Sequence, residues 1–442
     1  MIDARDDLAR TPAHDLALSC VEAGIGAAHP ERVVRDRVDV AGEQLRIADE
    51  VIDLDGFDEV VVLGGGKAAA HAAVALEAVL GDRLDGGVVV TDDPVETERV
   101  TVREGDHPVP SGRGVESARA VQEAAEDADD DTLVLAVLTG GGSALLPAPA
   151  EGLELSDLQS VTESLLAAGA PIEAVNAVRK HCSAIKGGQL ARAAAPVTIV
   201  TLLFSDVVGD DPAVIASGPT VPDPTTFADA RRTLDEFDID APEAVRERIE
   251  RGADGEVEET PDADHPVFER TSTHVLANGR TAIDAARDVA ADAGFTPLVL
   301  AAGIEGEARE VAKTHAAVAR EIRETGNPVE PPAVVLSGGE TTVTVEGDGR
   351  GGPNCEFALS AARSLPSSTV LAAVDTDGRD GASGAAGALV DAETVDDDAA
   401  SGRALSDNDA ATYLDEQDAL LRTGPTGTNV NDLHVLIVSD EE

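Results

Sequence analysis

Residues 59–73 read EVVVLGGGKAAAHAA, and this stretch decides which fold class the chain can adopt. An apolar run typical of a β-strand leads into three glycines and Lys67, and an alanine-rich run typical of a helix follows. The segment fits the dinucleotide-binding pattern G-x-G-x-x-A through Gly64, Gly66 and Ala69, whereas the P-loop pattern fails because no Ser or Thr follows Lys67. Spacing alone leaves three interpretations open: a phosphate cradle, a dinucleotide turn and a packed turn.

The same alternation of strand and helix continues along the first half of the chain. Apolar runs predict strands at 59–63, 86–91, 132–138 and 197–204, and helical periodicity predicts helices at 67–80, 111–126, 156–169 and 172–187. Strands that are apolar on both faces and alternate with helices are typical of a parallel sheet covered on both sides. We therefore expect an α/β fold.

A second region of alternating elements follows residues 252–266, GADGEVEETPDADHP, an acidic and proline-bearing segment without periodicity that we interpret as a linker. This linker divides the chain into an N-terminal domain at 1–251 and a C-terminal domain at 267–442. A chain of 442 residues is long enough for two or three domains. In the second region a short strand, TTVTV, directly after the strand-like AVVLSGGE indicates a mixed sheet.

The charge is extreme: 85 acidic residues against 33 basic ones leave a formal net charge of −52. Such a surface repels nucleic acid and anionic membranes. Disorder is excluded because the acidic residues are interspersed with strong strand and helix patterns at 43% hydrophobic content. Molar salt shortens the Debye length to about 3 Å and screens the repulsion, so we infer the salt-rich cytoplasm of an extreme halophile. No export signal and no long apolar run is recognisable, and the oligomeric state is open, a homodimer included.

Lysine is scarce, with only four residues against 29 arginines. Three of the four, Lys67, Lys180 and Lys186, lie in or beside glycine-bearing motifs, which makes them candidates for chemistry. The three cysteines have neither disulfide nor zinc-site spacing, and we expect free thiols in a reducing compartment.

The ends of the predicted strands in the first half carry candidate anion sites, since open α/β sheets bind ligands at the carboxyl ends of their strands. Backbone amides around glycines, with the hydroxyl of Ser143, could form anion-binding nests, and the candidates are Gly64, Gly65, Gly66, Gly141 and Gly142. A second candidate is a polar helix face at spacings of three and four, formed by Asn176, Arg179, Lys180, Ser183 and Lys186. This face would suit a carboxylate or a phosphate. The alternatives are an ordinary tight turn and cations that complement a helix dipole.

Acidic and glycine-rich loops supply further candidates. Asp206 follows the strand at 197–204, a position suited to binding a metal or accepting a proton, and Asp375 and Asp377 are close enough to share a cation. The second half adds candidate ligand-contacting residues in LSGGETTVTVEGDGRGGPNCEFAL and TGPTGTNVNDL, namely Glu340, Asn354, Glu356, Thr426 and Asn429. The glycine-rich part of the first of these segments is expected to form a hairpin, and Asn354 is also compatible with a simple helix cap.

Taken in order, these segments resemble the glycerate 2-kinase family, whose C-terminal region is called the MOFRL domain. The resemblance spans roughly residues 10–438 and is carried by GGGKAAAHAA, GDHPVPSGRG, TGGGSALLPAP, NAVRKHCSAIKGGQLA, SDVVGDDPAVIASGPT, SGGETTVTVEGDGRGGPNCEFAL, DTDGRDGASGAAGA and TGPTGTNVNDL. It implies an ATP- and Mg²⁺-dependent kinase that phosphorylates the 2-hydroxyl of D-glycerate. It also implies a larger Rossmann-like N-terminal domain, a smaller α/β C-terminal domain, and a site in the cleft between them.

The resemblance also implies catalytic roles for Lys67 and Asp206. Many relatives have an arginine and a glutamine where this chain has Pro353 and Cys355, so the third basic role falls to Arg350, with Arg379 as the other substitute. We therefore hypothesise that Asp206 accepts or orients the proton of the glycerate hydroxyl and that Asp375 and Asp377 help to hold Mg²⁺. The cations of the 176–186 helix would bind the glycerate carboxylate.

Three other functions stay open at this stage. An NAD(P)-dependent hydroxypyruvate reductase would use the G-x-G-x-x-A match, but it needs an acidic residue about 20 positions further on. The nearest candidates, Asp92 and Asp93, lie 28 and 29 residues after Gly64. A kinase for another small sugar acid and a non-catalytic sugar-phosphate sensor are the remaining alternatives.

Overall fold

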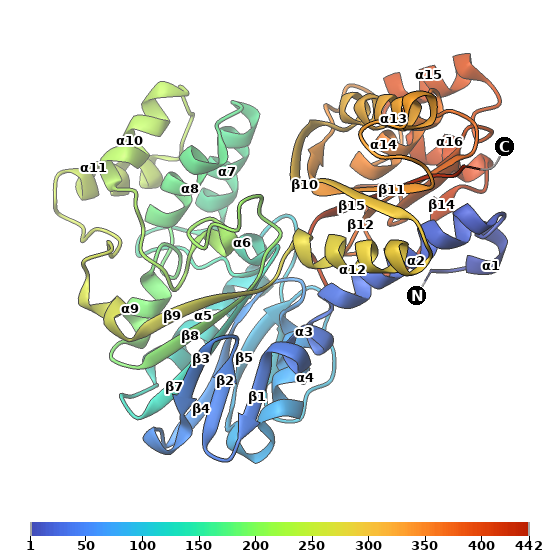
Figure 1. The fold of residues 1–442 in the computed structure, drawn as a ribbon. Helices are drawn as coiled ribbons and strands as arrows, with labels where there is room; N and C mark the ends of the chain where they lie inside the picture. Colours follow the sequence, from blue (N-terminus) through green and yellow to red (C-terminus); the bar gives the residue numbers. More distant parts are fainter. Residues whose placement is uncertain (1, 441–442) are drawn as a thin grey trace. The chain divides into compact units, whose positions relative to one another are not determined.

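The computed structural model describes residues 2–440 and consists of two compact units (Figure 1). The large unit comprises Val33–Ser205 and Asp210–Leu276, and the small unit comprises the residues up to Arg32, Asp206–Gly209, and the chain from Ala277 onward. The predicted domain boundaries therefore need correction. The N-terminal helices belong with the C-terminal half of the chain, and the boundary falls after Leu276 rather than at 252–266.

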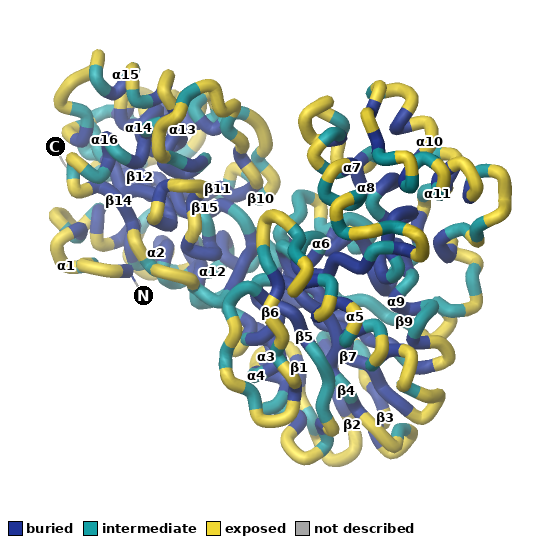
Figure 2. The backbone as a smooth tube through the Cα atoms, turned by 180° about the vertical axis from the view of Figure 1, so that it is seen from behind, coloured by how far each residue is buried: buried dark blue, intermediate teal, exposed yellow. Residues whose placement is uncertain are grey.

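The large unit is built on a six-stranded sheet with the order β6-β5-β4-β7-β8-β9. Its strands are β4 (Glu59–Gly65), β5 (Gly86–Thr91), β6 (Thr101–Glu104), β7 (Thr132–Thr139), β8 (Thr198–Phe204) and β9 (Thr271–Ala277). The pairs from β6 to β8 are all parallel, as predicted. Every residue of β7 is buried because helices cover both faces of the sheet, which explains its unbroken apolar sequence (Figure 2).

Helices of the large unit match most of the predicted ranges. They are α4 (Ala69–Leu80), α5 (Gly112–Glu126), α6 (Gly142–Leu145), α7 (Leu155–Ala167), α8 (Ile172–His181), α9 (Gln189–Ala194), α10 (Phe227–Glu236) and α11 (Glu243–Ala253), while α3 (Pro30–Arg37) begins in the small unit. The helix predicted at 172–187 ends at His181, and Gly187 and Gly188 then adopt positive φ. Lys186 therefore lies outside the helix, directly before this turn.

Two parts of the large unit differ from the sequence interpretation. Residues 38–53 form a separate antiparallel sheet of β1 (Val38–Ala41), β2 (Gln44–Ile47) and β3 (Glu50–Asp53), whose strands are too short for periodicity to indicate. The segment interpreted as a linker packs within the large unit. The Glu259 carboxylate accepts the Phe227 N–H at 3.0 Å, and the Thr260 hydroxyl donates to Asp223 at 3.0 Å.

The small unit contains a mixed sheet with the order β10-β11-β15-β12-β13-β14. Its strands are β10 (Thr296–Glu307), β11 (Ala333–Thr342), β12 (Thr369–Asp375), β13 (Gly387–Asp391), β14 (Leu420–Leu421) and β15 (Asp432–Val438). Within this sheet of the described structure, β10 and β11 are paired in parallel and the other neighbours are antiparallel. The predicted mixed sheet is confirmed, but TTVTV is not a separate strand, because its first residues continue β11.

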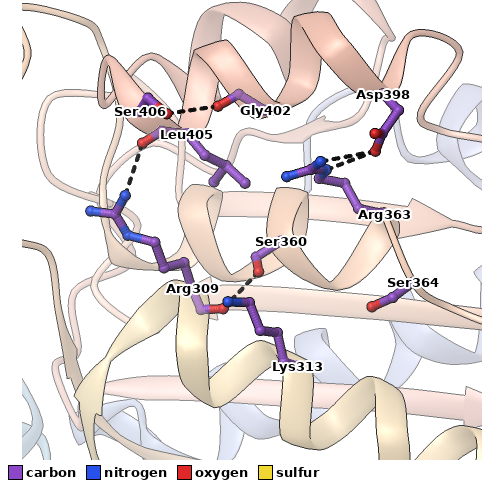
Figure 3. A pocket seen from close by; sticks show the side chains of 9 residues that line it. All are labelled: Arg309, Lys313, Ser360, Arg363, Ser364, Asp398, Gly402, Leu405 and Ser406. Carbon is purple, nitrogen blue, oxygen red and sulfur yellow. Dashed lines mark hydrogen bonds and ion pairs between the residues drawn. The ribbon is translucent and has the colours of Figure 1, made fainter.

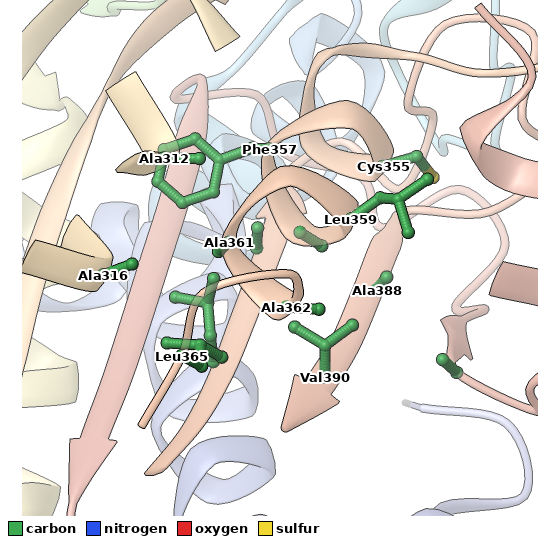
Figure 4. Packing of buried hydrophobic residues seen from close by; sticks show 14 of the residues in the cluster. Ala312, Ala316, Cys355, Phe357, Leu359, Ala361, Ala362, Leu365, Ala388 and Val390 are labelled. Atoms are coloured by element: carbon green, nitrogen blue, oxygen red, sulfur yellow. The ribbon is translucent and has the colours of Figure 1, made fainter. Parts of the chain in front are cut away.

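Helices cover both faces of this sheet. In Figure 1, α2 (Pro12–Ala28) and α12 (Gly279–Asp292) lie side by side on one face, and α13 (Ala308–Thr325) and α14 (Pro353–Ala362) lie on the other. The short helices α1 (Arg5–Leu8), α15 (Asp398–Ser406) and α16 (Ala410–Glu416) complete the unit. Its core is rich in alanine, with Phe357 and Leu359 among the larger side chains (Figure 4). Small side chains allow helices and sheet to approach closely, which suits a chain with 2% aromatic residues.

Gly64 offers a direct test of the packing that joins β4 to β7. A Cβ at this position would lie 1.9 Å from the Val137 carbonyl oxygen, and φ is +140°. Gly64→Ala is therefore expected to lower the free energy of unfolding by about 3 kcal/mol or more. Gly112→Ala, at the start of α5 with nothing within 4 Å, is the control and should change stability little. Guanidinium chloride unfolding measures both, and equal midpoints would contradict this account of the strand pair.

Candidate functional site

The glycine turn after β4 is a packed turn. Its backbone amides donate within the protein: Gly66 to the Val90 carbonyl at 2.9 Å, Lys67 to the Gly140 carbonyl at 2.8 Å, and Ala68 to the Thr139 hydroxyl at 3.1 Å. Because the Gly66 donor is already used within the protein, it is not available to a phosphate, and the predicted phosphate contacts of Gly64 and Gly65 stay predictions. The three glycines are buried and allow neighbouring backbone to approach, and the turn they form positions Lys67.

Lys67 lies beside the glycine loop that follows β7. A Cβ at Gly141 would be 3.1 Å from Lys67 Cγ and 3.1 Å from His107 Cδ2, so the three residues meet at one place. Gly141 has a φ of +77° and precedes the short helix α6. Within residues 2–440, the backbone N–H groups of Gly142 and Ser143 have no acceptor. Gly141, Gly142 and Ser143 therefore keep the predicted capacity to bind an anion.

A chain of hydrogen bonds links Ser143 to the helix α8. The Ser143 and Ser217 hydroxyl oxygens lie 2.6 Å apart, and Ser217 donates to the Asn176 side-chain oxygen at 3.1 Å. Ser217 and the preceding Ala216 both have positive φ, at +61° and +51°, a conformation that costs energy in residues other than glycine. The amide nitrogen of Asn176 is buried without a partner in the described structure. A polar ligand group here would satisfy it.

Two cations, the buried Lys186 and the half-buried Arg179, lie next to this network. Lys186 donates to the Leu146 carbonyl at 3.2 Å, and neither residue has a carboxylate partner anywhere in residues 2–440. Burial, and then the charge of nearby Arg179, lower the pKa of Lys186 to about 7. Burial also lowers the pKa of Arg179. Two cations held without acidic partners form a site that an anionic ligand would stabilise.

Lys180 does not belong to this site, contrary to the prediction. Its ammonium group forms an ion pair with Asp223 at 3.1 Å, and both side chains are buried. Asp223 also accepts from Thr225 and Thr260, so this pair connects α8 to the segments around it. Helical spacing alone could not separate Lys180 from its neighbours, because the spacing does not show which side chain will meet the distant Asp223.

The two cations open into a cavity of about 800 Å³ on the large unit. The segment at 107–110 and the residues in and around α6 line one part of it, namely His107, Pro108, Val109, Pro110, Gly141, Ser143, Ala144 and Pro147. Residues of α7 and of α8 with its following turn line the rest, namely Leu158, Gln159, Val161, Thr162, Glu163, Leu166, Ala167, Arg179, Cys182, Ser183 and Lys186. Sequence analysis identified its basic residues and missed its apolar wall, because apolar residues of α7 are also expected from ordinary core packing.

A second cavity, of about 420 Å³, lies on the small unit between α13, α14 and α15 (Figure 3). It also contains cations, but each is paired with a carboxylate: Arg363 with Asp398 at 2.9 Å and Lys313 with Glu310 at 2.6 Å. Arg309 is held by Glu307 at 2.9 Å and donates to the Leu405 carbonyl. The first cavity is therefore the better anion site.

Asp206 and Asn429, two of the predicted site residues, are in direct contact. The chain leaves β8, contributes Asp206–Gly209 to the small unit and returns. The Asn429 side-chain amide donates to the Asp206 carboxylate at 3.1 Å, and the Asn431 amide donates to the Asp206 carbonyl. One face of the Asp206 carboxylate is thus oriented by the loop before β15.

The same loop contacts the acidic turn after β12. Thr426 donates its hydroxyl to the Thr376 carbonyl at 2.6 Å and its N–H to the Asp377 carbonyl at 3.2 Å. Asp375 and Asp377 each accept a backbone N–H two residues ahead, at 3.0 and 2.7 Å. Among residues 2–440 no group of three or more His, Cys, Asp or Glu side chains is arranged to hold a metal. A metal here would have to take most of its ligands from substrate and water.

Asn354 belongs to a polar network, but its side-chain oxygen has no hydrogen-bond partner within residues 2–440, so its predicted contact with substrate stays a prediction. Asn354 is buried, with a side-chain amide that donates to Asp432 at 2.7 Å and a backbone N–H that donates to Asp380 at 2.8 Å. Asp380 also accepts the Cys355 N–H and so caps α14. Burial raises the pKa of Asp380, and it raises the pKa of Asp432 to about 6.

Glu356 is also buried and structural. Its carboxylate accepts from Asn408 at 2.7 Å, and Asn408 in turn accepts the N–H groups of Glu346 and Gly347. The predicted glycine-rich hairpin is therefore an irregular loop tied to the segment before α16. Arg350 forms an exposed ion pair with Asp415 at 3.2 Å, which gives no support to a catalytic role. Glu340 lies exposed on β11, opposite Glu305 of β10.

Fold and site together define an α/β enzyme that acts on small anionic molecules. Comparison with known proteins gives the family. Residues 16–250 match a family described only as a domain of unknown function, DUF4147, and residues 333–432 match the MOFRL family. The chain belongs to the glycerate kinase family with a MOFRL domain.

Three similar proteins illustrate the comparison, two of them named as glycerate kinases. A glycerate 2-kinase of Pyrococcus horikoshii is 40% identical over 437 residues, covering 97% of this chain and 98% of the relative. The crystal structure of a glycerate kinase from Thermotoga maritima superposes with a TM-score of 0.81 at 35% identity, covering 96% and 98% of the two chains. A protein of Agrobacterium vitis, provisionally named a hydroxypyruvate reductase, is 44% identical over 388 residues, covering 86% and 87%. Among the described residues, no helix is long and apolar enough to cross a membrane.

The lowered pKa of Lys186 predicts pH-dependent anion binding. Sulfate keeps its charge between pH 6 and 9, whereas Lys186 loses its proton near pH 7, so sulfate affinity should fall as pH rises through this value. Isothermal titration calorimetry measures the dissociation constant. Lys186→Met should weaken binding and remove the pH dependence, and Lys313→Met, in the paired cavity, should do neither. A pH-independent affinity in the unmodified protein would contradict the assignment.

The free energy of unfolding should depend on pH in the opposite direction to the sulfate affinity. Because the folded-state pKa of Lys186 lies below its ordinary value of 10.5, the unfolded chain binds more protons between pH 7 and 10.5. The contribution of Lys186 to the free energy of unfolding therefore increases with pH across this window.

Proposed function

We propose that this protein transfers the γ-phosphoryl group of ATP to the 2-hydroxyl of D-glycerate and yields 2-phosphoglycerate. The observation that carries the proposal is the pair of acid-free cations, Arg179 and Lys186, in a cavity beside the Lys67 turn. Membership of the glycerate kinase family supports the substrate and the reaction. The choice of the 2-hydroxyl is supported by the relatives named glycerate 2-kinase.

Phosphoryl transfer asks the protein mainly to position two substrates and to stabilise charge on the transferring group. We assign the charge stabilisation to Lys67, with the Gly142 and Ser143 amides as hydrogen-bond donors. Arg179 and Lys186 bind an anionic group of the substrates. Asp206, oriented by Asn429, accepts or orients the proton of the attacking hydroxyl.

Asp375 and Asp377 are proposed to hold Mg²⁺. Each accepts a backbone N–H within the turn, and among residues 2–440 no group of three or more His, Cys, Asp or Glu side chains is arranged to hold a metal. This fits the usual protein site for Mg²⁺, which takes one or two carboxylates and completes its shell with substrate phosphates and water. When bound there, Mg²⁺ neutralises charge on the phosphates. The backbone N–H of Arg379 donates to the Asp377 carboxylate, so Arg379 is itself part of this acidic turn.

The reductase alternative gains no support from the geometry. A dinucleotide turn needs free amides at the first βα junction for the pyrophosphate. The Gly66, Lys67 and Ala68 amides are already bonded within the protein. The hydroxypyruvate reductase name of the Agrobacterium relative is therefore not extended to this chain.

Replacement of Lys67 tests the proposed function. Lys67→Ala should lower kcat for D-glycerate phosphorylation by about two to three orders of magnitude, because one charge-stabilising group is lost from the transition state. Lys313→Ala, at an exposed ion pair on the small unit, is the control and should retain full turnover. Resolution of 2- from 3-phosphoglycerate by NMR identifies the product. NADH oxidation by hydroxypyruvate without coupling enzymes, in place of phosphorylation, would refute the kinase assignment.

We further propose that the enzyme operates in a salt-rich cytoplasm. With a net charge of −52, self-repulsion is strong at 0.1 M salt, where the Debye length is about 10 Å, and weak at 1 M, where it is about 3 Å. The midpoint of thermal unfolding should therefore rise steadily from 0.1 to 3 M KCl, together with activity. Differential scanning calorimetry measures the midpoint, and a midpoint independent of salt would contradict the proposal.

A further inference from the structure

The cavity on the large unit is too large for a three-carbon acid alone. Its volume of about 800 Å³ lies in the range of pockets that enclose ligands of drug or cofactor size. Glycerate would contact only a small part of the wall. The cavity therefore fits the larger of the two substrates of a kinase, the nucleotide.

The wall has two chemically different parts. Arg179, Lys186, Ser143 and Ser183 supply cations and hydroxyl groups in one part. The other part is apolar and combines residues of the loop at 107–110 with the α7 side chains Leu158, Val161 and Leu166. A nucleotide has the same division, because charged phosphates are joined to a flat, largely apolar base.

Exposed apolar side chains at this cavity support the same conclusion. Val109 is 63% exposed and Leu166 is 58% exposed, and both line the cavity. Only six large apolar side chains in residues 2–440 are exposed, so two at one cavity is a concentration on a strongly acidic surface. A bound base would cover them, and Gln159, Thr162 and Glu163 offer polar groups to its edge.

We propose that this cavity binds the nucleoside end of the phosphoryl donor between the loop at 107–110 and α7, with the phosphates at Arg179 and Lys186. The inference rests on the proposed kinase function and deepens it. It places the donor on the large unit and leaves glycerate to other groups, so the carboxylate role considered for the 176–186 helix passes to the nucleotide phosphates. The large unit then selects the nucleotide, and Val109 and Leu166 are specificity-determining residues.

The test is nucleotide binding in the full chain, without glycerate and without turnover. Titration with the fluorescent analogue MANT-ADP, with unlabelled ATP as competitor, measures affinity. Leu166→Asp and Val109→Asp should each raise the dissociation constant of ATP at least about tenfold, because each removes an apolar contact and adds a charge beside the base. Ile172→Asp is the matched control: Ile172 is 46% exposed near the same helices but does not line the cavity, and its affinity should equal that of the unmodified protein.

Steady-state kinetics separate this inference from the proposed function. The two cavity variants should raise KM for ATP and leave KM for D-glycerate unchanged. Unchanged ATP affinity in both variants, or a rise in KM for glycerate alone, overturns the nucleotide pocket while the kinase function stands. A third outcome is that the unmodified protein binds ATP but phosphorylates no glycerate, and that the variants lose ATP binding. This result supports the pocket and overturns the proposed function.

Discussion

The close approach of β4 to β7 is the constraint on which the proposed site depends. Without a side chain at Gly64, the Val137 carbonyl can pair with β4, and the two strands end at the same level of the sheet. The turn after β4 is then closed onto the loop after β7, through the Lys67 amide and the Gly140 carbonyl. Lys67 and the Gly141 loop are thereby positioned as one rigid element, and the α8 turn with Lys186 packs beside it.

Electrostatics identify the function of this element. The buried Lys180 and the cations of the second cavity are all paired with carboxylates. The buried Lys186 and the half-buried Arg179 have no such partners within residues 2–440, although the chain has 85 acidic residues. Burying unpaired charge is unfavourable, and burial accordingly lowers the pKa of both side chains. A bound anion would compensate this cost, and this is the basis of the proposed role of the two residues in binding.

In the small unit, two residues that the sequence predicts to contact a ligand are buried inside the protein. Asn354 and Glu356 lie in a glycine-rich motif that is typical of a ligand loop, yet both are buried in hydrogen-bond networks with Asp380, Asp432 and Asn408. These networks cap α14 and hold the loop after β11. They give the small unit a rigid frame, on which Asp206, Asn429 and the acidic turn after β12 are presented.

The sequence by itself determined the α/β class, nearly all long helices and strands, the family, and the candidate residues Lys67, Ser143, Arg179 and Lys186. Local periodicity and composition carry that information, because each depends on residues close in the chain. Only the tertiary structure decided that the opening glycines form a packed turn, that Lys180 is an internal ion pair, and that the N-terminal helix α2 belongs to the small unit. Those facts depend on hydrogen bonds and contacts between residues far apart in the chain, and no pattern along the sequence encodes which partner a donor, a charge or an apolar face will meet.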